Sequence, residues 1–143
     1  MSRLPVVILL CVATTACAGA IRWAEPQDFS FSMVDNPKEK RYDIALTSSA
    51  TAPLCLMKEN WPAEDGTFPT GDEGAVLTMT TGLLQPKAVM TAYCPGGCGE
   101  VRLEPGQTMR STIAYAAFGD AEIVAVDPVR SLSFRVQPFY CKR

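Results

Sequence analysis

The stretch RYDIALTSS, residues 41–49, decides the fold class, because its apolar side chains recur at every second position. Tyr42, Ile44 and Leu46 alternate with residues that are polar or small. Strict alternation is typical of a β-strand that has one face on a core and the other face in water. The stretch therefore predicts a half-buried strand.

The same alternation recurs towards both ends of the chain. It is clear in DFSFSMV, residues 28–34, and in SLSFRVQPFYC, residues 131–141. Turn-forming residues such as Gly82 with Pro86 separate the candidate strands. Residues 116–126 fit either a strand or a short helix that opens near Asp120. Weaker strand candidates are residues 52–57, 75–80, 87–93, 100–103 and 107–115.

Two segments carry a resemblance to a known group of folds. RYDIALTSSATAPLCL, residues 41–56, followed by VRLEPGQTMRSTIAY, residues 101–115, resembles the Ig-like β-sandwiches of exported bacterial proteins. Some of those proteins are protease inhibitors, so the resemblance implies a fold and not an activity. Together with the strand spacing, it leads us to expect an all-β, Ig-like antiparallel β-sandwich of seven to eight strands over residues 21–143.

The N-terminus has the plan of a secretory signal peptide over residues 1–20. Arg3 precedes an apolar run at residues 4–16, and small residues with an A-x-A spacing follow. The run is too short for a permanent transmembrane helix. Cleavage after Ala20 would release a soluble protein, whereas lipidation of Cys17 would give a membrane-anchored lipoprotein. Both alternatives export the protein to the periplasm or outside the cell, and Cys17 is its one expected route to a membrane.

Export changes how the cysteines are interpreted. Cys55, Cys94, Cys98 and Cys141 follow the predicted signal peptide, and an even number of cysteines in an oxidising compartment indicates disulfides. Four cysteines allow three pairings. Proximity and the flexible Pro-Gly-Gly spacer favour Cys94–Cys98, which leaves Cys55–Cys141 to tie an early strand to the last one.

The motif CPGGC, residues 94–98, has three interpretations. As a redox pair, it has one spacer residue too many for a thioredoxin-like motif, and its glycines disfavour the helix that activates the first cysteine. As a copper clamp, it lacks the histidine of copper-delivery proteins, although methionines such as Met33 could bind Cu(I). We expect a structural disulfide and no metal or other cofactor. Copper or thiol-redox handling through Cys94 and Cys98 is the alternative.

The polar segment KENWPAEDGTFPTGDEG, residues 58–74, is the candidate binding loop. Loops of this length in compact domains are often functional. Trp61 and Phe68 are aromatic residues of the kind that anchors protein interfaces. Asp65 and Asp72 add negative charge, but their spacing matches no EF-hand calcium loop. Alternatively, Trp61 folds back and covers the end of the sandwich.

Composition argues against several functional classes. The chain has no histidine, which removes Ser-His-Asp and Cys-His catalysis and histidine-based zinc sites. A net charge of −2 without a basic patch argues against a nucleic-acid partner. We therefore expect a non-catalytic binding or structural module of the bacterial cell envelope whose partner is another protein. One version is an inhibitor that presents the 58–74 loop to a secreted hydrolase.

Overall fold

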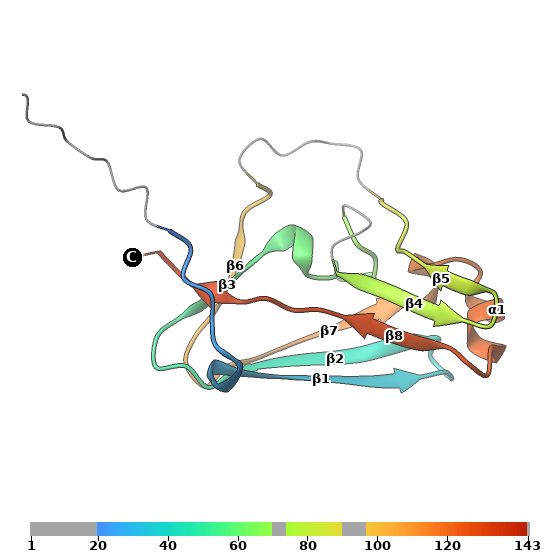
Figure 1. Ribbon diagram of the computed structural model, residues 1–143, viewed down its shortest axis with the longest axis horizontal. Coiled ribbons are helices and arrows are strands. Elements are labelled where there is room, and N and C mark those ends of the chain that lie inside the picture. The colour runs from blue at the N-terminus through green and yellow to red at the C-terminus, as the bar shows by residue number, and fades with distance from the viewer. Residues whose placement is uncertain (1–19, 70–73, 90–96, 143) are drawn as a thin grey trace, which may run out of the picture.

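The computed structural model describes residues 20–69, 74–89 and 97–142, in which strands predominate (Figure 1). These residues form nine strands in three antiparallel sheets. The first sheet has the order β1-β2-β7, with strands Phe29–Asn36, Arg41–Ser48 and Thr108–Ala114. The second has the order β6-β3-β9, with strands Glu100–Leu103, Leu54–Met57 and Phe139–Tyr140. The third has the order β5-β4-β8, with strands Gly82–Leu84, Ala75–Met79 and Ser131–Phe134.

Helix is scarce in the described residues, and the protein is all-β. The one α-helix there is α1 at Ala121–Val126. Three single-turn 3₁₀ helices lie before β1, between β3 and β4, and between β7 and α1: η1 at Pro26–Asp28, η2 at Lys58–Asn60 and η3 at Tyr115–Ala117.

The core lies between the first sheet and the other two. Figure 1 shows β1 and β2 on one side, with β4 and β8 on the other. Buried residues of all three sheets meet in one cluster, for example Leu46 of β2, Leu56 of β3 and Leu77 of β4. Residues 135–138 run from β8 directly into β9, so one C-terminal segment joins the two smaller sheets.

The alternating patterns form strands where they were predicted. In β2, the side chains of Tyr42, Ile44 and Leu46 are buried and those between them are more exposed. β1 and β8 alternate in the same way, and their rings Phe31 and Phe134 lie 5.8 Å apart between the two layers. The weaker candidates at 52–57, 75–80, 100–103 and 107–115 contain β3, β4, β6 and β7.

Several predictions about the strands differ from the described structure. Residues 131–141 form two strands, because the chain leaves the third sheet after Phe134, and Pro138 has no N–H for a ladder. Gly82, expected in a turn, begins the strand β5. Residues 87–89 make only an isolated bridge, between Ala88 and Phe68, and residues 90–93 lie outside the described residues. The described strands therefore number nine rather than seven to eight.

Of the two alternatives for residues 116–126, a strand or a short helix, the structure has a helix at their C-terminal end. Asp120 caps α1, because its carboxylate accepts a hydrogen bond from the Glu122 N–H at 2.9 Å. Val124 is the residue that α1 buries in the core.

The candidate binding loop packs into the core over residues 58–69. Phe68 is completely buried and Trp61 is only 7% exposed. Their rings lie 5.5 Å and 6.5 Å from the ring of Phe134. Burying one such side chain stabilises a fold by roughly 1.5–3 kcal/mol, which favours withdrawal of both rings from water. The expectation that they are exposed anchors is therefore wrong, and the alternative in which Trp61 folds back is the better description.

Gly66 allows this loop to lie against β7. Its carbonyl oxygen accepts the Ala114 N–H at 2.9 Å. A Cβ atom at position 66 would lie 2.7 Å from the Ala114 nitrogen, and the φ angle of 78° also favours glycine. The loop thus covers one end of the outer edge of β7.

The Cys55–Cys141 disulfide is confirmed. It joins β3 to the C-terminus across a sequence separation of 86 residues. A closed loop of that length stabilises by roughly 4–5 kcal/mol in the chain-entropy account. Cys98 is also disulfide-bonded, whereas Cys94 and Cys17 lie outside the described residues, so the Cys94–Cys98 pairing and the signal peptide stay predictions.

We predict that Phe68→Ala lowers the free energy of unfolding by about 3–5 kcal/mol, because it leaves a cavity beside Phe134. Phe68→Leu, the matched control, should lose less because it keeps most of the apolar volume. Urea unfolding of both variants measures the difference. A Phe68→Ala variant as stable as the parent would contradict the buried position of this ring.

Candidate functional site

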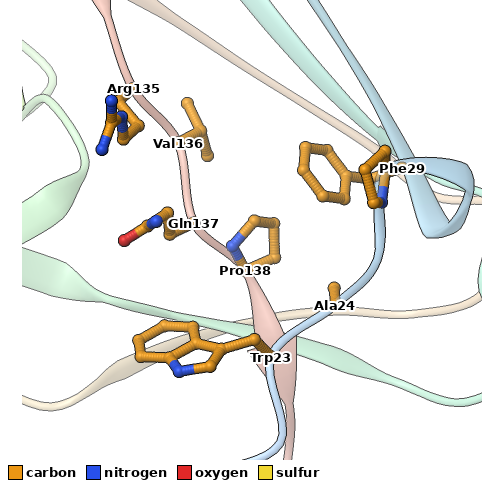
Figure 2. A pocket seen from close by; sticks show the side chains of 8 residues that line it. Trp23, Ala24, Phe29, Arg135, Val136, Gln137 and Pro138 are labelled. Carbon is orange, nitrogen blue, oxygen red and sulfur yellow. The ribbon is translucent and has the colours of Figure 1, made fainter.

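A groove of about 320 Å³ lies between the N-terminal segment and the residues that join β8 to β9 (Figure 2). Figure 2 shows Phe29 across from Val136 and Pro138, with the ring of Trp23 below them. We call this feature the Trp23 groove. Its lining residues are Trp23, Ala24, Pro26, Phe29, Arg135, Val136, Gln137 and Pro138.

Backbone hydrogen bonds hold the two walls of the Trp23 groove together. The Ala24 N–H donates to the Pro138 carbonyl at 2.9 Å, and the Tyr140 N–H donates to the Arg22 carbonyl at 2.8 Å. The Arg22 guanidinium also lies 4.3 Å from the centre of the Tyr140 ring. The N-terminal segment is therefore fastened to the C-terminal one.

The turn η1 directs the chain from one wall into β1. The Asp28 N–H donates to the Glu25 carbonyl at 2.9 Å, and the Glu25 N–H donates to an Asp28 carboxylate oxygen at 2.8 Å. Pro26 is favourable at the first position because its φ angle is already helical. Phe29 follows this turn and enters the groove at the start of β1.

Trp23 is the residue that makes this groove unusual. Its ring meets the ring of Phe139 edge to face, with centres 6.0 Å apart and an angle of 83° between the planes. Even so, Trp23 is 53% exposed. Exposed tryptophan is costly in water and frequent among the residues that dominate protein interfaces.

The groove has the chemistry of a binding site for apolar side chains. Its walls are mostly apolar, and the exposed residues Arg135 and Gln137 supply a guanidinium and an amide. Apolar walls with a few polar groups are typical of ligand-binding clefts. None of the eight lining residues is a cysteine, serine, aspartate or glutamate, so the lining supplies neither a nucleophile nor a carboxylate pair.

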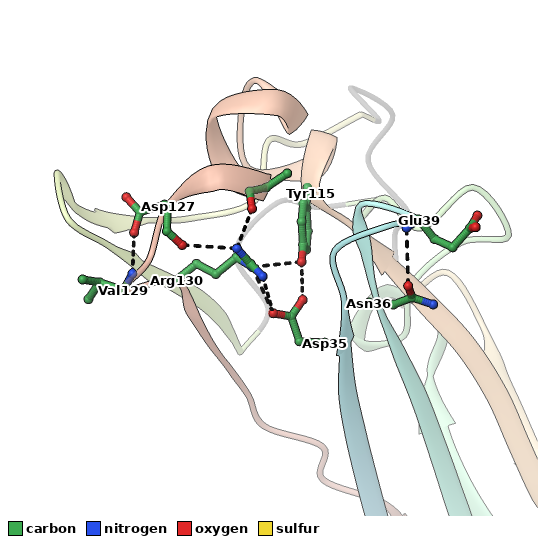
Figure 3. A network of polar contacts seen from close by, with 8 residues as sticks. Asp35, Asn36, Glu39, Tyr115, Asp127, Val129 and Arg130 are labelled. Carbon is green, nitrogen blue, oxygen red and sulfur yellow. Dashed lines mark hydrogen bonds and ion pairs between the residues drawn. The ribbon is translucent and has the colours of Figure 1, made fainter.

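A network of polar side chains lies at the opposite end of the molecule from the Trp23 groove, near α1 (Figure 3). The Arg130 Nε donates to Asp35 at 2.9 Å and to the Tyr115 hydroxyl oxygen at 3.0 Å. The Arg130 Nη1 donates to the carbonyls of Ala125 and Asp127 at 2.6 Å and 3.2 Å. The Tyr115 hydroxyl in turn donates to Asp35. This network ties the end of β1 to η3 and to the residues before β8.

The network is structural, because its members satisfy one another and Tyr115 is completely buried. Burial, followed by the hydrogen bond to Asp35, raises the pKa of Tyr115 to about 12 from an ordinary value of 10.0. Burial also raises the pKa of Tyr42, whose ring centre is 5.3 Å from that of Tyr115. Both hydroxyls are therefore protonated over the physiological range.

Of the predicted binding-loop residues, Trp61 and Phe68 meet at Phe134 in the core, whereas Asp65 lies in an exposed turn. Asp65 closes a local turn, because its carboxylate accepts from the Thr67 hydroxyl at 2.6 Å and the Thr67 N–H at 3.0 Å. These bonds lower the pKa of Asp65. Asp72 lies outside the described residues. No group of three or more metal-binding side chains of the histidine, cysteine, aspartate or glutamate type occurs within residues 20–69, 74–89 and 97–142.

The Trp23 groove was missed by sequence reasoning. Trp23 stands before the first alternating stretch, in a segment without periodicity, and the opposite wall of its groove, residues 135–138, is more than a hundred residues away. The one available signal was a tryptophan close to a proline between the predicted signal peptide and the first strand.

Comparison with known proteins adds no family to these observations. No protein-family model matches the chain, and no curated protein resembles it significantly. Among the described residues, no helix is long and apolar enough to cross a membrane.

We predict that Tyr115→Phe lowers the free energy of unfolding at pH 8 by about 1.5–3 kcal/mol, because a hydrogen bond to a carboxylate is lost. In the parent, the folded-state pKa of Tyr115 exceeds the unfolded value. The stabilisation is therefore complete below pH 10 and is lost as the pH rises through about 12. Urea unfolding measures the free energy of unfolding at pH values between 10 and about 12. Over this range, that free energy should fall less steeply with pH for Tyr115→Phe than for the parent. Equal slopes would contradict the network.

Proposed function

We propose that the protein is a non-catalytic binding module that holds a partner protein in the Trp23 groove. The observation that carries this proposal is the half-exposed Trp23 ring beside a mostly apolar groove of about 320 Å³. Large exposed aromatic side chains next to preformed concavities are the usual centres of binding energy in protein interfaces.

The preformed walls of the groove support the same proposal. The groove needs no rearrangement to accept a side chain, because backbone hydrogen bonds at Ala24 and Tyr140 already hold both walls. A rigid site loses less conformational entropy on binding than a flexible one. The volume suits one or two apolar side chains of a partner better than a large cofactor.

We also propose that the fold is an Ig-like β-sandwich in an exported protein. The two layers around one core support the first part, and the resemblance of residues 41–56 and 101–115 to such sandwiches agrees with it. The Cys55–Cys141 disulfide supports export, because disulfides persist in oxidising compartments. Lipidation at Cys17 remains the alternative to release after Ala20.

A hydrolase inhibitor remains one version of the proposal, but with a different contact surface. Trp61 and Phe68 are buried, so the contact would be made by the Trp23 groove instead of these rings. Copper handling has less support, because Cys98 is disulfide-bonded and offers no thiolate ligand. Thiol-redox handling through Cys94 and Cys98 remains the alternative.

The test places a photo-reactive amino acid at Gln137, in the groove, and at Leu83, a residue of β5 that is 70% exposed and does not line the groove. In cells, we expect Gln137 to give a discrete crosslinked adduct and Leu83 to give none. Mass spectrometry of the adduct identifies the partner.

We predict that Trp23→Ala weakens binding of that partner by about 30-fold or more, the loss typical of an interface hot spot. Leu83→Ala, the matched control, should bind as the parent does. Both melting temperatures should stay close to that of the parent, because Trp23 is 53% exposed and Leu83 is 70% exposed. The proposal fails if Trp23→Ala leaves partner binding unchanged or if the two positions crosslink equally.

A further inference from the structure

The outer edge of β1 is open in the described structure. β1 is an end strand of its sheet and bonds to β2 alone. Its register with β2 is continuous from the Phe29–Ser48 pair to the Asn36–Arg41 pair, without a bulge. Phe29–Asn36 contains no proline, lysine or arginine, which often protect an edge strand, and its one charged residue is Asp35 near the C-terminal end.

The backbone of alternate β1 residues points away from β2. The Ser49 N–H donates to the Asp28 carbonyl at 2.8 Å, outside the Phe29–Ser48 pair. In an antiparallel ladder, hydrogen-bonded and non-hydrogen-bonded pairs alternate. When the residues next to a pair are joined by a hydrogen bond in this way, the two residues of the pair do not bond to each other. The N–H and C=O groups of Phe29 therefore point outwards, and so do those of Phe31 and Met33. Such an edge is complementary to another extended strand.

The side chains of β1 are complementary to those of a second β1. Phe29, Phe31 and Met33 face the core side, whereas Ser30 and Ser32 face solvent. In an antiparallel pair, opposite residues lie on the same face of the sheet. Two copies of this strand would therefore set apolar residues against apolar residues and serines against serines.

We propose that β1 pairs with β1 of a second copy of this chain, antiparallel, around a two-fold axis at Phe31. In this register Phe31 lies opposite Phe31 of the other copy, and Phe29 lies opposite its Met33. These outward-facing residues exchange the hydrogen bonds between the copies. The β1-β2-β7 sheets of the two copies then form one continuous sheet. The pairing goes beyond the proposed partner binding in the Trp23 groove.

Charge does not oppose a second copy within this register. The whole chain carries a net charge of −2, so two copies repel at a distance. The overlap at residues 29–33 is nevertheless uncharged, and Asp28 and Asp35 both fall outside it. No two carboxylates are opposite each other, so the paired strands avoid the like-charge contacts that destabilise a sheet.

The register gives a charge-based test at two exposed serines, because Ser30 lies opposite Ser32 of the second copy. Ser30→Lys with Ser32→Lys sets lysine against lysine at both symmetry-related places. Ser30→Lys with Ser32→Glu sets lysine against glutamate at the same places. Sedimentation velocity of the protein as cells produce it, over roughly a hundredfold range of concentration, measures each dimer dissociation constant.

We expect the parent to form a dimer that dissociates on dilution. The lysine–lysine variant should dimerise about tenfold or more weakly than the lysine–glutamate variant, with similar melting temperatures, since Ser30 and Ser32 are exposed. Trp23→Ala should leave the dissociation constant unchanged, because Trp23 is outside the overlap. A parent that is monomeric throughout, or two charge variants with equal dissociation constants, would overturn the proposal even if the groove binds its partner. Capture of β1 by a strand of another protein instead would overturn it as well.

Discussion

The packing around Phe134 is the constraint on which the rest of the structure depends. Its ring lies 5.8 Å from Phe31, 5.5 Å from Phe68 and 6.5 Å from Trp61, measured between ring centres. These partners belong to the first strand and to the long loop, whereas Phe134 ends β8. A single side chain of β8 therefore contacts both the first sheet and the loop. The loop is part of the core for this reason, and its aromatic residues are not available to a partner.

The ends of the chain depend on the same C-terminal segment. After Phe134, residues 135–138 form one wall of the Trp23 groove, and β9 then leads to the Cys55–Cys141 disulfide. The N-terminal segment pairs with this wall through backbone hydrogen bonds at Ala24 and Tyr140. The groove thus lies where the two ends of the described chain meet, on a support that a covalent bond also restrains. This rigidity distinguishes it from a loop-based site.

Sequence reasoning succeeded where local chemistry determines structure. Alternation identified β1, β2 and β8, and cysteine pairing gave Cys55–Cys141. Asp120 marked the start of α1 in one of the two alternatives for residues 116–126. It failed where distant segments decide the outcome. Nothing local to residues 58–69 indicates that Phe68 meets Phe134, because that stretch has no apolar period. The Trp23 groove was invisible for the same reason, since its walls become neighbours only when the two ends of the chain pair.

The central claim is that one of the two tryptophans is a contact residue and the other is core. Acrylamide quenching of the single-tryptophan variants Trp61→Phe and Trp23→Phe tests it most directly. The Trp61→Phe variant, which retains Trp23, should fluoresce at longer wavelength and be quenched readily, as expected for a ring that is 53% exposed. The Trp23→Phe variant should be blue-shifted and protected, because Trp61 is 7% exposed. Ready quenching of Trp61 together with protection of Trp23 would contradict the account. It would favour the 58–74 loop as the binding surface instead.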